Sequence, residues 1–144
     1  MTDASREIHG ACHCGNLSFV IHTRMPLENI RARACDCSFC CIHAARNWSD
    51  PDGTAVIRVN DAGHLHKYRF ALRTADFYIC TTCGTYLGAV LSDERGAWST
   101  LNLRLAKISV EEEIASYGSE NADDRIDRRK RDWTPTEIHL GAAG

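Results

Sequence analysis

The sequence has no long apolar stretch, and its first ten residues lack the apolar core expected of a secretory leader. Its longest clean apolar run, Tyr86 to Leu91, is far too short to span a bilayer. The first ten residues contain two acids, an arginine and no apolar core, so they do not form a signal peptide. We therefore expect a cytoplasmic protein without membrane contact, whose cysteines stay reduced rather than forming disulfides.

The chain also lacks a strong net charge, internal repeats and linkers. A net charge of −2 excludes a generally basic nucleic-acid-binding protein, although a local basic patch is still possible. With 144 residues, of which 44% are hydrophobic and 25% charged, the composition is that of one ordinary globular domain. We expect no nucleic acid as a partner, and the sequence leaves the oligomeric state open.

Cysteine, in contrast, is abundant and closely spaced. The eight cysteines fall into three groups: Cys12 and Cys14; Cys35, Cys37 and Cys40 followed by Cys41; and Cys80 and Cys83. In a reducing compartment such spacing favours metal binding, and zinc is a metal that thiolates hold in structural and catalytic sites. The alternative is that these are buried structural cysteines or disulfide partners.

The densest group is Cys35-Asp36-Cys37-Ser38-Phe39-Cys40, in which one turn presents three sulfurs to a single ion. Ser38 is a good N-cap, and residues 39–46 read as a short helix that begins there. Cys40 would then lie in the first helical turn, where free N–H groups favour a thiolate. Three thiolates leave one coordination position open, so this group predicts a reactive site.

The other two groups are knuckles closed by glycine, Cys12-His13-Cys14-Gly15 and Cys80-Thr81-Thr82-Cys83-Gly84. Two plus two cysteines make a closed four-thiolate site, which predicts a structural zinc. Cys41 would point about 100° away from Cys40 on the helix, so we interpret it as a core residue rather than a ligand. We expect His13, His64 and His66 not to be ligands.

Short alternating runs dominate the rest and predict a mainly β fold with a few short helices. The expected strands are 17–22, 30–34, 55–59, 65–70, 75–79, 86–91 and 97–103, with a hairpin at 60–63. A capping box at 109–112 predicts a helix that ends at Gly118. Residues 123–131 predict a polar helix, either a solvated face or a site for an anionic substrate or RNA. We expect Trp133 to anchor the tail.

Taken together, the three cysteine groups resemble the glutathione-dependent formaldehyde-activating enzyme family, whose domain is shared with centromere protein V. The resemblance covers residues 9–106 and includes all seven expected cysteines in order. It implies the zinc-stapled β-tent (Mss4-like) fold and two Zn²⁺ ions per chain. The structural zinc would correspond to Cys12, Cys14, Cys80 and Cys83, and the catalytic-type zinc to Cys35, Cys37 and Cys40.

The resemblance further implies a carbon–sulfur lyase that forms or cleaves S-hydroxymethylglutathione-like adducts, with glutathione or another small thiol and a small aldehyde as partners. On this interpretation residues 1–8 are a tail, 9–106 the zinc-binding β domain, and 107–144 a helical basic segment packed on it. The alternative is a non-catalytic zinc module that binds protein or RNA. A methionine sulfoxide reductase is disfavoured because no cysteine follows Cys83.

Overall fold

The computed structural model describes residues 5–141, so residues 1–4 of the expected tail and residues 142–144 lie outside the described part. Within it, the predicted mainly β fold is confirmed. The strands are β1 (Arg6–Ala11), β2 (Leu17–Thr23), β3 (Arg31–Cys35), β4 (Asn47–Trp48), β5 (Thr54–Val59), β6 (Leu65–Tyr68), β7 (Asp76–Cys80), β8 (Tyr86–Asp93), β9 (Gly96–Asn102), β10 (Glu111–Ala115) and β11 (Thr134–Leu140). The helices are α1 (Ser38–His43), α2 (Ala122–Asp132) and three short 3₁₀ turns, Leu27–Asn29, Ala62–His64 and Leu103–Leu105.

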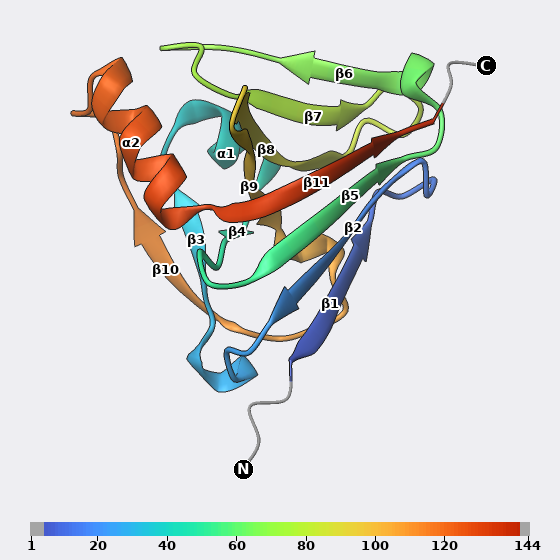
Figure 1. Cartoon of the computed structure of the whole chain (residues 1–144), viewed down its shortest axis with the longest axis horizontal. Coiled ribbons are helices and arrows are strands. Elements are labelled where there is room, and N and C mark those ends of the chain that lie inside the picture. Colours follow the sequence, from blue (N-terminus) through green and yellow to red (C-terminus); the bar gives the residue numbers. More distant parts are fainter. Residues whose placement is uncertain (1–4, 142–144) are drawn as a thin grey trace.

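The strands form one open, mixed sheet (Figure 1). Its main path runs β1-β2-β5-β11-β9-β4-β3-β10, and β8, β7 and β6 branch from β9. Two pairs are parallel, β5 with β11 and β3 with β10, and the other pairs are antiparallel. β11, from the end of the chain, therefore lies inside the sheet, where it pairs with β5 and β9.

Alternation of buried residues with half-buried or exposed ones explains how β1, β2 and β5 pack on the larger core. Along β2 every second residue is buried, beginning at Leu17 and ending at Thr23, as expected for a strand with one face on the core. β2 pairs with β1 on one side and β5 on the other, and its inward side chains join those of Ile8 and Ile57 in the larger hydrophobic core. The strands predicted at 17–22 and 55–59 are thus confirmed.

A second, smaller core lies on the other side of the β7-β8-β9 segment. In β8, Leu87 and Val90 belong to the larger core, whereas Tyr86 and Ala89 belong to the smaller one. This explains why the strand reads as a continuous apolar run, since both of its faces are covered. Cys80, at the end of β7, belongs to the larger core, and Cys40, on α1, to the smaller one.

Two sequence predictions about the middle of the chain are wrong. The expected hairpin at 60–63 does not form, because β5 pairs with β2 and β11 while β6 pairs with β7. The expected helix after the capping box at 109–112 is instead the strand β10, which lies parallel to β3. The edge of β3 that faces β10 offers backbone hydrogen bonds to this mostly exposed segment. These hydrogen bonds outweigh the helical signal in the local sequence.

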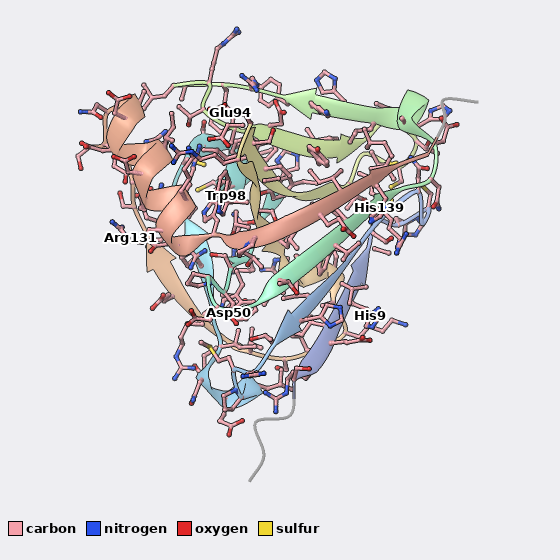
Figure 2. The ribbon with its side chains drawn as sticks, in the orientation of Figure 1. His9, Asp50, Glu94, Trp98, Arg131 and His139 are labelled. Atoms are coloured by element: carbon pink, nitrogen blue, oxygen red, sulfur yellow. The ribbon has the colours of Figure 1, made fainter. Side chains whose placement is uncertain are left out.

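The predicted polar helix at 123–131 is confirmed as α2, capped at its start by Asn121. Trp133, which follows it, is buried, and β11 begins at the next residue. Figure 2 shows Trp98 on the sheet side of α2 and Arg131 on its outer side, and the Nζ atom of Lys130 lies 5.2 Å from the Trp98 ring centroid. Among residues 5–141, no helix has the length and apolar character needed to cross a membrane.

Candidate metal centres

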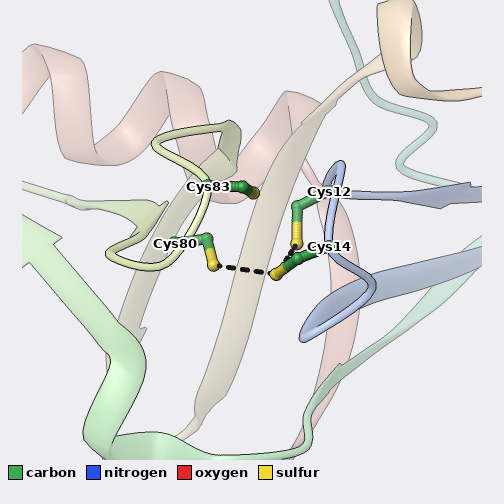
Figure 3. Close-up of side chains that lie close together, drawn as sticks. All are labelled: Cys12, Cys14, Cys80 and Cys83. Carbon is green, nitrogen blue, oxygen red and sulfur yellow. Dashed lines mark hydrogen bonds between the residues drawn. The ribbon is translucent and has the colours of Figure 1, made fainter.

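The first candidate centre is a group of four thiols. Cys12 and Cys14 come from the turn between β1 and β2, and Cys80 and Cys83 from the end of β7 and the turn that follows it. Figure 3 shows their side chains pointing toward one another, and all four Sγ atoms lie within 4.8 Å of each other. The Sγ atom of Cys14 lies 3.7 Å from that of Cys12 and 3.5 Å from that of Cys80.

These distances fit a tetrahedral zinc ion. Four sulfurs about 2.3 Å from one zinc lie about 3.8 Å from each other. Both turns close on a glycine with a left-handed backbone, at a φ of 87° for Gly15 and 78° for Gly84. A backbone N–H of Leu17 donates to the Sγ atom of Cys12 at 3.3 Å. The turns therefore present sulfurs and amides together, as the glycine-closed knuckles predicted.

Within this group the environment favours a thiolate at Cys83, whereas the pKa values of Cys12 and Cys14 are raised. Burial raises the pKa of Cys83, but its hydrogen bond with the Thr85 hydroxyl and those with the backbone of Cys14 and Thr85 outweigh this effect and lower it to about 5. A deprotonated sulfur is the form that binds a metal. The four residues together can hold one ion between two turns that are far apart in the sequence.

The second candidate centre is a group of three thiols. Cys35 ends β3, Cys37 precedes α1, and Cys40 lies in its first turn, with the three Sγ atoms within 4.8 Å of one another. The N-cap of α1 is Cys37, not Ser38 as predicted, because the Cys37 Sγ atom accepts a hydrogen bond from the Cys40 N–H at 3.4 Å. The helix therefore begins at Ser38 and ends at His43, which is shorter than the predicted 39–46.

Proton sharing within this group produces one strongly acidic sulfur. Hydrogen bonds from the thiols of Cys35 and Cys40, together with backbone N–H groups at the start of α1, lower the pKa of Cys37 to about 2. The same interactions raise the pKa of the Cys40 thiol. Three sulfurs with one negative charge already in place can bind a soft cation and release protons as they do so.

Cys41 does not belong to the group. It is exposed on α1 rather than buried in the core as predicted, and its Sγ atom lies 3.9 Å from the Cys35 carbonyl oxygen. We expect Cys41→Ser to leave the metal content and the melting temperature of the protein unchanged, because the side chain neither packs nor joins the three sulfurs. The metal-to-protein ratio and a thermal melt check this, and a loss of metal would place Cys41 among the ligands.

The three-thiol group opens into a cavity of about 600 Å³. Aromatic and cationic side chains line it beside the thiols. The aromatic ones are Phe70, Phe77, Tyr86, Tyr117 and Trp133, and the arginines are Arg33, Arg125, Arg128 and Arg129. Only two carboxylates, Asp36 and Glu120, are among the described residues that line it, so the cavity is suited to a small ligand with an apolar part and a negative charge.

A hydrogen-bonded chain supports the sulfur of Cys40 from the protein side. The Asn47 Nδ2 atom lies 3.5 Å from the Cys40 Sγ atom, and the Tyr86 hydroxyl donates to Asn47 Oδ1 at 3.1 Å. Burial raises the pKa of Tyr86 well above its ordinary value, so the hydroxyl stays protonated and remains a donor. The chain fixes the Asn47 amide with its NH₂ group toward the sulfur.

The sequence reasoning missed these supporting residues. Arg33 lies two positions before Cys35 on β3, and the period of two places both on one face, which could have been read from the sequence. The sequence around the arginines of α2 carried no such signal, because it does not indicate which face of a polar helix packs against the sheet. Of the histidines considered, His64 lies 3.4 Å from the Thr81 hydroxyl and 3.7 Å from Asp61.

Comparison with known proteins assigns no family to the chain. No protein-family model matches it, and no curated protein does. Among solved structures, the crystal structure of a Rhodobacter sphaeroides protein is similar, with 25% sequence identity and a TM-score of 0.49. The match covers 73% of this chain and 99% of that one. The two cysteine groups, which could each hold a metal ion, therefore carry the functional argument.

Proposed function

We propose that the protein binds two zinc ions and that the second takes part in chemistry between a small thiol and a small aldehyde. The observation that carries the proposal is that only three thiols converge in a cavity, whereas four converge in the other group. A zinc ion with three thiolate ligands keeps a position at which a thiol can bind and lose its proton, or at which a carbonyl oxygen can be polarised.

The four-thiol group is the structural site in this proposal. Cys12 and Cys80 are buried in the larger core, Cys83 is half-buried and Cys14 is exposed, and an ion held by the four would join two distant turns. The three-thiol group lies beside the smaller core, with Cys35 and Cys37 only partly buried and facing the cavity. The smaller number of thiols and the adjoining cavity support a different role for this group.

The resemblance to the glutathione-dependent formaldehyde-activating family suggests the substrates. In that reaction a carbon–sulfur bond forms between the thiol and formaldehyde, and the proton lost by the thiol ends on the former carbonyl oxygen. Phe70, Phe77 and Trp133 line the cavity and would exclude water from such an adduct. Their apolar surfaces suit the carbon skeleton of the thiol, while the arginines suit its negative charge.

The reaction is tested by the exchange between free and adducted glutathione, followed by magnetisation-transfer NMR. We expect the zinc-loaded protein to accelerate this exchange above the rate in buffer, and Cys37→Ser to return it to that rate. Because the adduct also forms without an enzyme, the buffer rate is the necessary control. Equal rates for the protein, the variant and buffer would contradict the enzyme proposal and favour a non-catalytic zinc module.

Asn47 allows a separate test of the second site. We expect Asn47→Ala to weaken zinc binding there by about 10- to 100-fold, because it removes the NH₂ group near the Cys40 sulfur and the acceptor of the Tyr86 hydroxyl. Competition with a chromophoric chelator measures this affinity. Asn29→Ala, at an exposed position, is the matched control. An unchanged affinity in Asn47→Ala would mean that the amide does not support the ligand.

A further inference from the structure

Arg129 is a buried cation in the wall of the cavity. Its residue is only 8% exposed, and it is the buried residue of a helix whose other residues are exposed or half-buried. The Nη1 atom donates to the Thr74 hydroxyl at 2.5 Å, and the guanidinium carbon lies 4.7 Å from the Trp133 ring centroid. The buried Nε atom has no hydrogen-bond partner among the described residues. A buried donor left without an acceptor is costly, so its retention calls for an explanation.

The neighbouring arginines have their own partner. Glu120 accepts hydrogen bonds from Arg128 at 2.7 and 3.0 Å and from Arg125 at 3.3 Å. Arg128 also lies over the Tyr117 ring, at 3.8 Å from its centroid. The single charge of Glu120 thus neutralises one of the two charges of Arg125 and Arg128. Within residues 5–141 no carboxylate forms an ion pair with Arg129.

The charge of Arg129 persists in spite of its burial. Desolvation lowers the pKa of Arg129 to about 10, so the guanidinium is still protonated at neutral pH. Across the cavity Arg33 donates to the hydroxyls of Ser49 and Thr100, at 2.7 and 3.3 Å, and within residues 5–141 it too has no ion-paired carboxylate. The cavity therefore holds uncompensated positive charge close to three sulfurs.

We propose that Arg129 is a specificity-determining residue of this cavity and binds a carboxylate of the substrate thiol. The proposal rests on the proposed function and adds a residue from α2, which lies outside the segment that resembles the zinc enzyme family. A guanidinium matches a carboxylate in shape and hydrogen-bonding geometry. Among the described residues, Arg129 and Arg33 are guanidinium groups without an ion-paired carboxylate, so each can balance the single charge of one carboxylate, whereas a phosphate dianion would meet repulsion from Glu120 and the thiolates.

The test uses S-methylglutathione, whose capped sulfur cannot act as a thiolate. Calorimetry on the zinc-loaded protein compares the wild type with Arg129→Met, which keeps the apolar stem and removes the charge. We expect binding to weaken at least about tenfold, while the melting temperature falls little, because replacing an uncompensated buried charge by an apolar side chain costs little stability. Arg131→Met, on the exposed side of the same helix, should bind like the wild type.

Two results would overturn the proposal: S-methylglutathione fails to bind the wild type, or it binds Arg129→Met equally well. If Arg129→Met does not fold, Arg129→Gln keeps a donor for Thr74 and should show the same loss. Inorganic phosphate should not compete at equal concentration, and equal competition would overturn the carboxylate assignment. A variant that loses zinc yet binds the probe normally would mean that Arg129 instead balances the thiolates.

Failure of the proposed function would look different. If glutathione exchange is never accelerated but S-methylglutathione binding still depends on Arg129, the result supports carboxylate binding by Arg129 and contradicts the proposed thiol–aldehyde reaction. Alternatively, exchange is accelerated for both glutathione and 2-mercaptoethanol, and equally in the wild type and in Arg129→Met. That result supports the proposed reaction and contradicts the specificity role of Arg129. The two proposals are therefore separable with the same set of variants.

Discussion

Cys80→Ser is expected to unfold much of the protein at temperatures where the wild type is stable. Cys80 is fully buried in the larger core, and its sulfur lies 3.5 Å from that of Cys14, which is 66 residues away in the sequence. The turns that carry these sulfurs belong to β1 and β7, which are not neighbours in the sheet. A metal ion held between these two turns would connect the β1 end of the sheet to the branch formed by β8, β7 and β6.

The expected size of the effect follows from the energy of such sites. Structural zinc contributes about 10 kcal/mol or more in small zinc peptides, which is comparable with the whole stability of a domain, about 5–15 kcal/mol. We expect the melting temperature to fall by more than about 10 °C, measured by circular dichroism. Cys41→Ser, the same exchange at an exposed site, is the control. A wild-type melting temperature in Cys80→Ser would remove the structural role of this site.

Cys37→Ser should have the opposite combination of effects: the second zinc and the thiol chemistry disappear, while the fold and the first zinc remain. Cys37 is the N-cap of α1, and serine is itself a preferred N-cap, so the substitution removes the acidic sulfur without removing the cap. The four-thiol group lies in a different core and is not disturbed.

Elemental analysis of the purified variant should give one zinc per chain where the wild type gives two. Its melting temperature should stay within a few degrees of the wild-type value. Loss of both metals, or of neither, would contradict the division into a structural and an open site. Cys12→Ser provides the reciprocal comparison, because it should damage the fold as well as the first metal site.

Local patterns predicted the parts of this structure that depend on local geometry. The cysteine spacings were sufficient to predict both thiol groups, because each short turn fixes where its own sulfurs point. The alternation in β2 likewise predicted a strand with Leu17, Phe19 and Ile21 on its buried face. Each cysteine pair or triplet and each strand face is made by residues close together in the sequence, and the count of two plus two thiols then matched the two distant turns to one site.

What could not be predicted depends on partners distant in the sequence. Glu111–Ala115 becomes β10 only because β3 offers a free edge, and that edge is invisible in the local signal. Arg129 lines the cavity because α2 packs against β8 and β9, whereas its charged sequence reads as a solvated helix. Asn47 contacts Cys40 from a two-residue strand too short to be recognised.

The position of β11 sets the order in which the protein can be completed during synthesis. β5 ends at Val59, but its partner on one edge, β11, comprises residues 134–140. A ribosome adds about 5–20 residues per second, so that edge waits roughly 4–16 s for its partner. All seven sulfurs of the two groups, in contrast, have been made by Cys83. In the nascent chain both sets of metal ligands are therefore available before the last strand can enter the sheet.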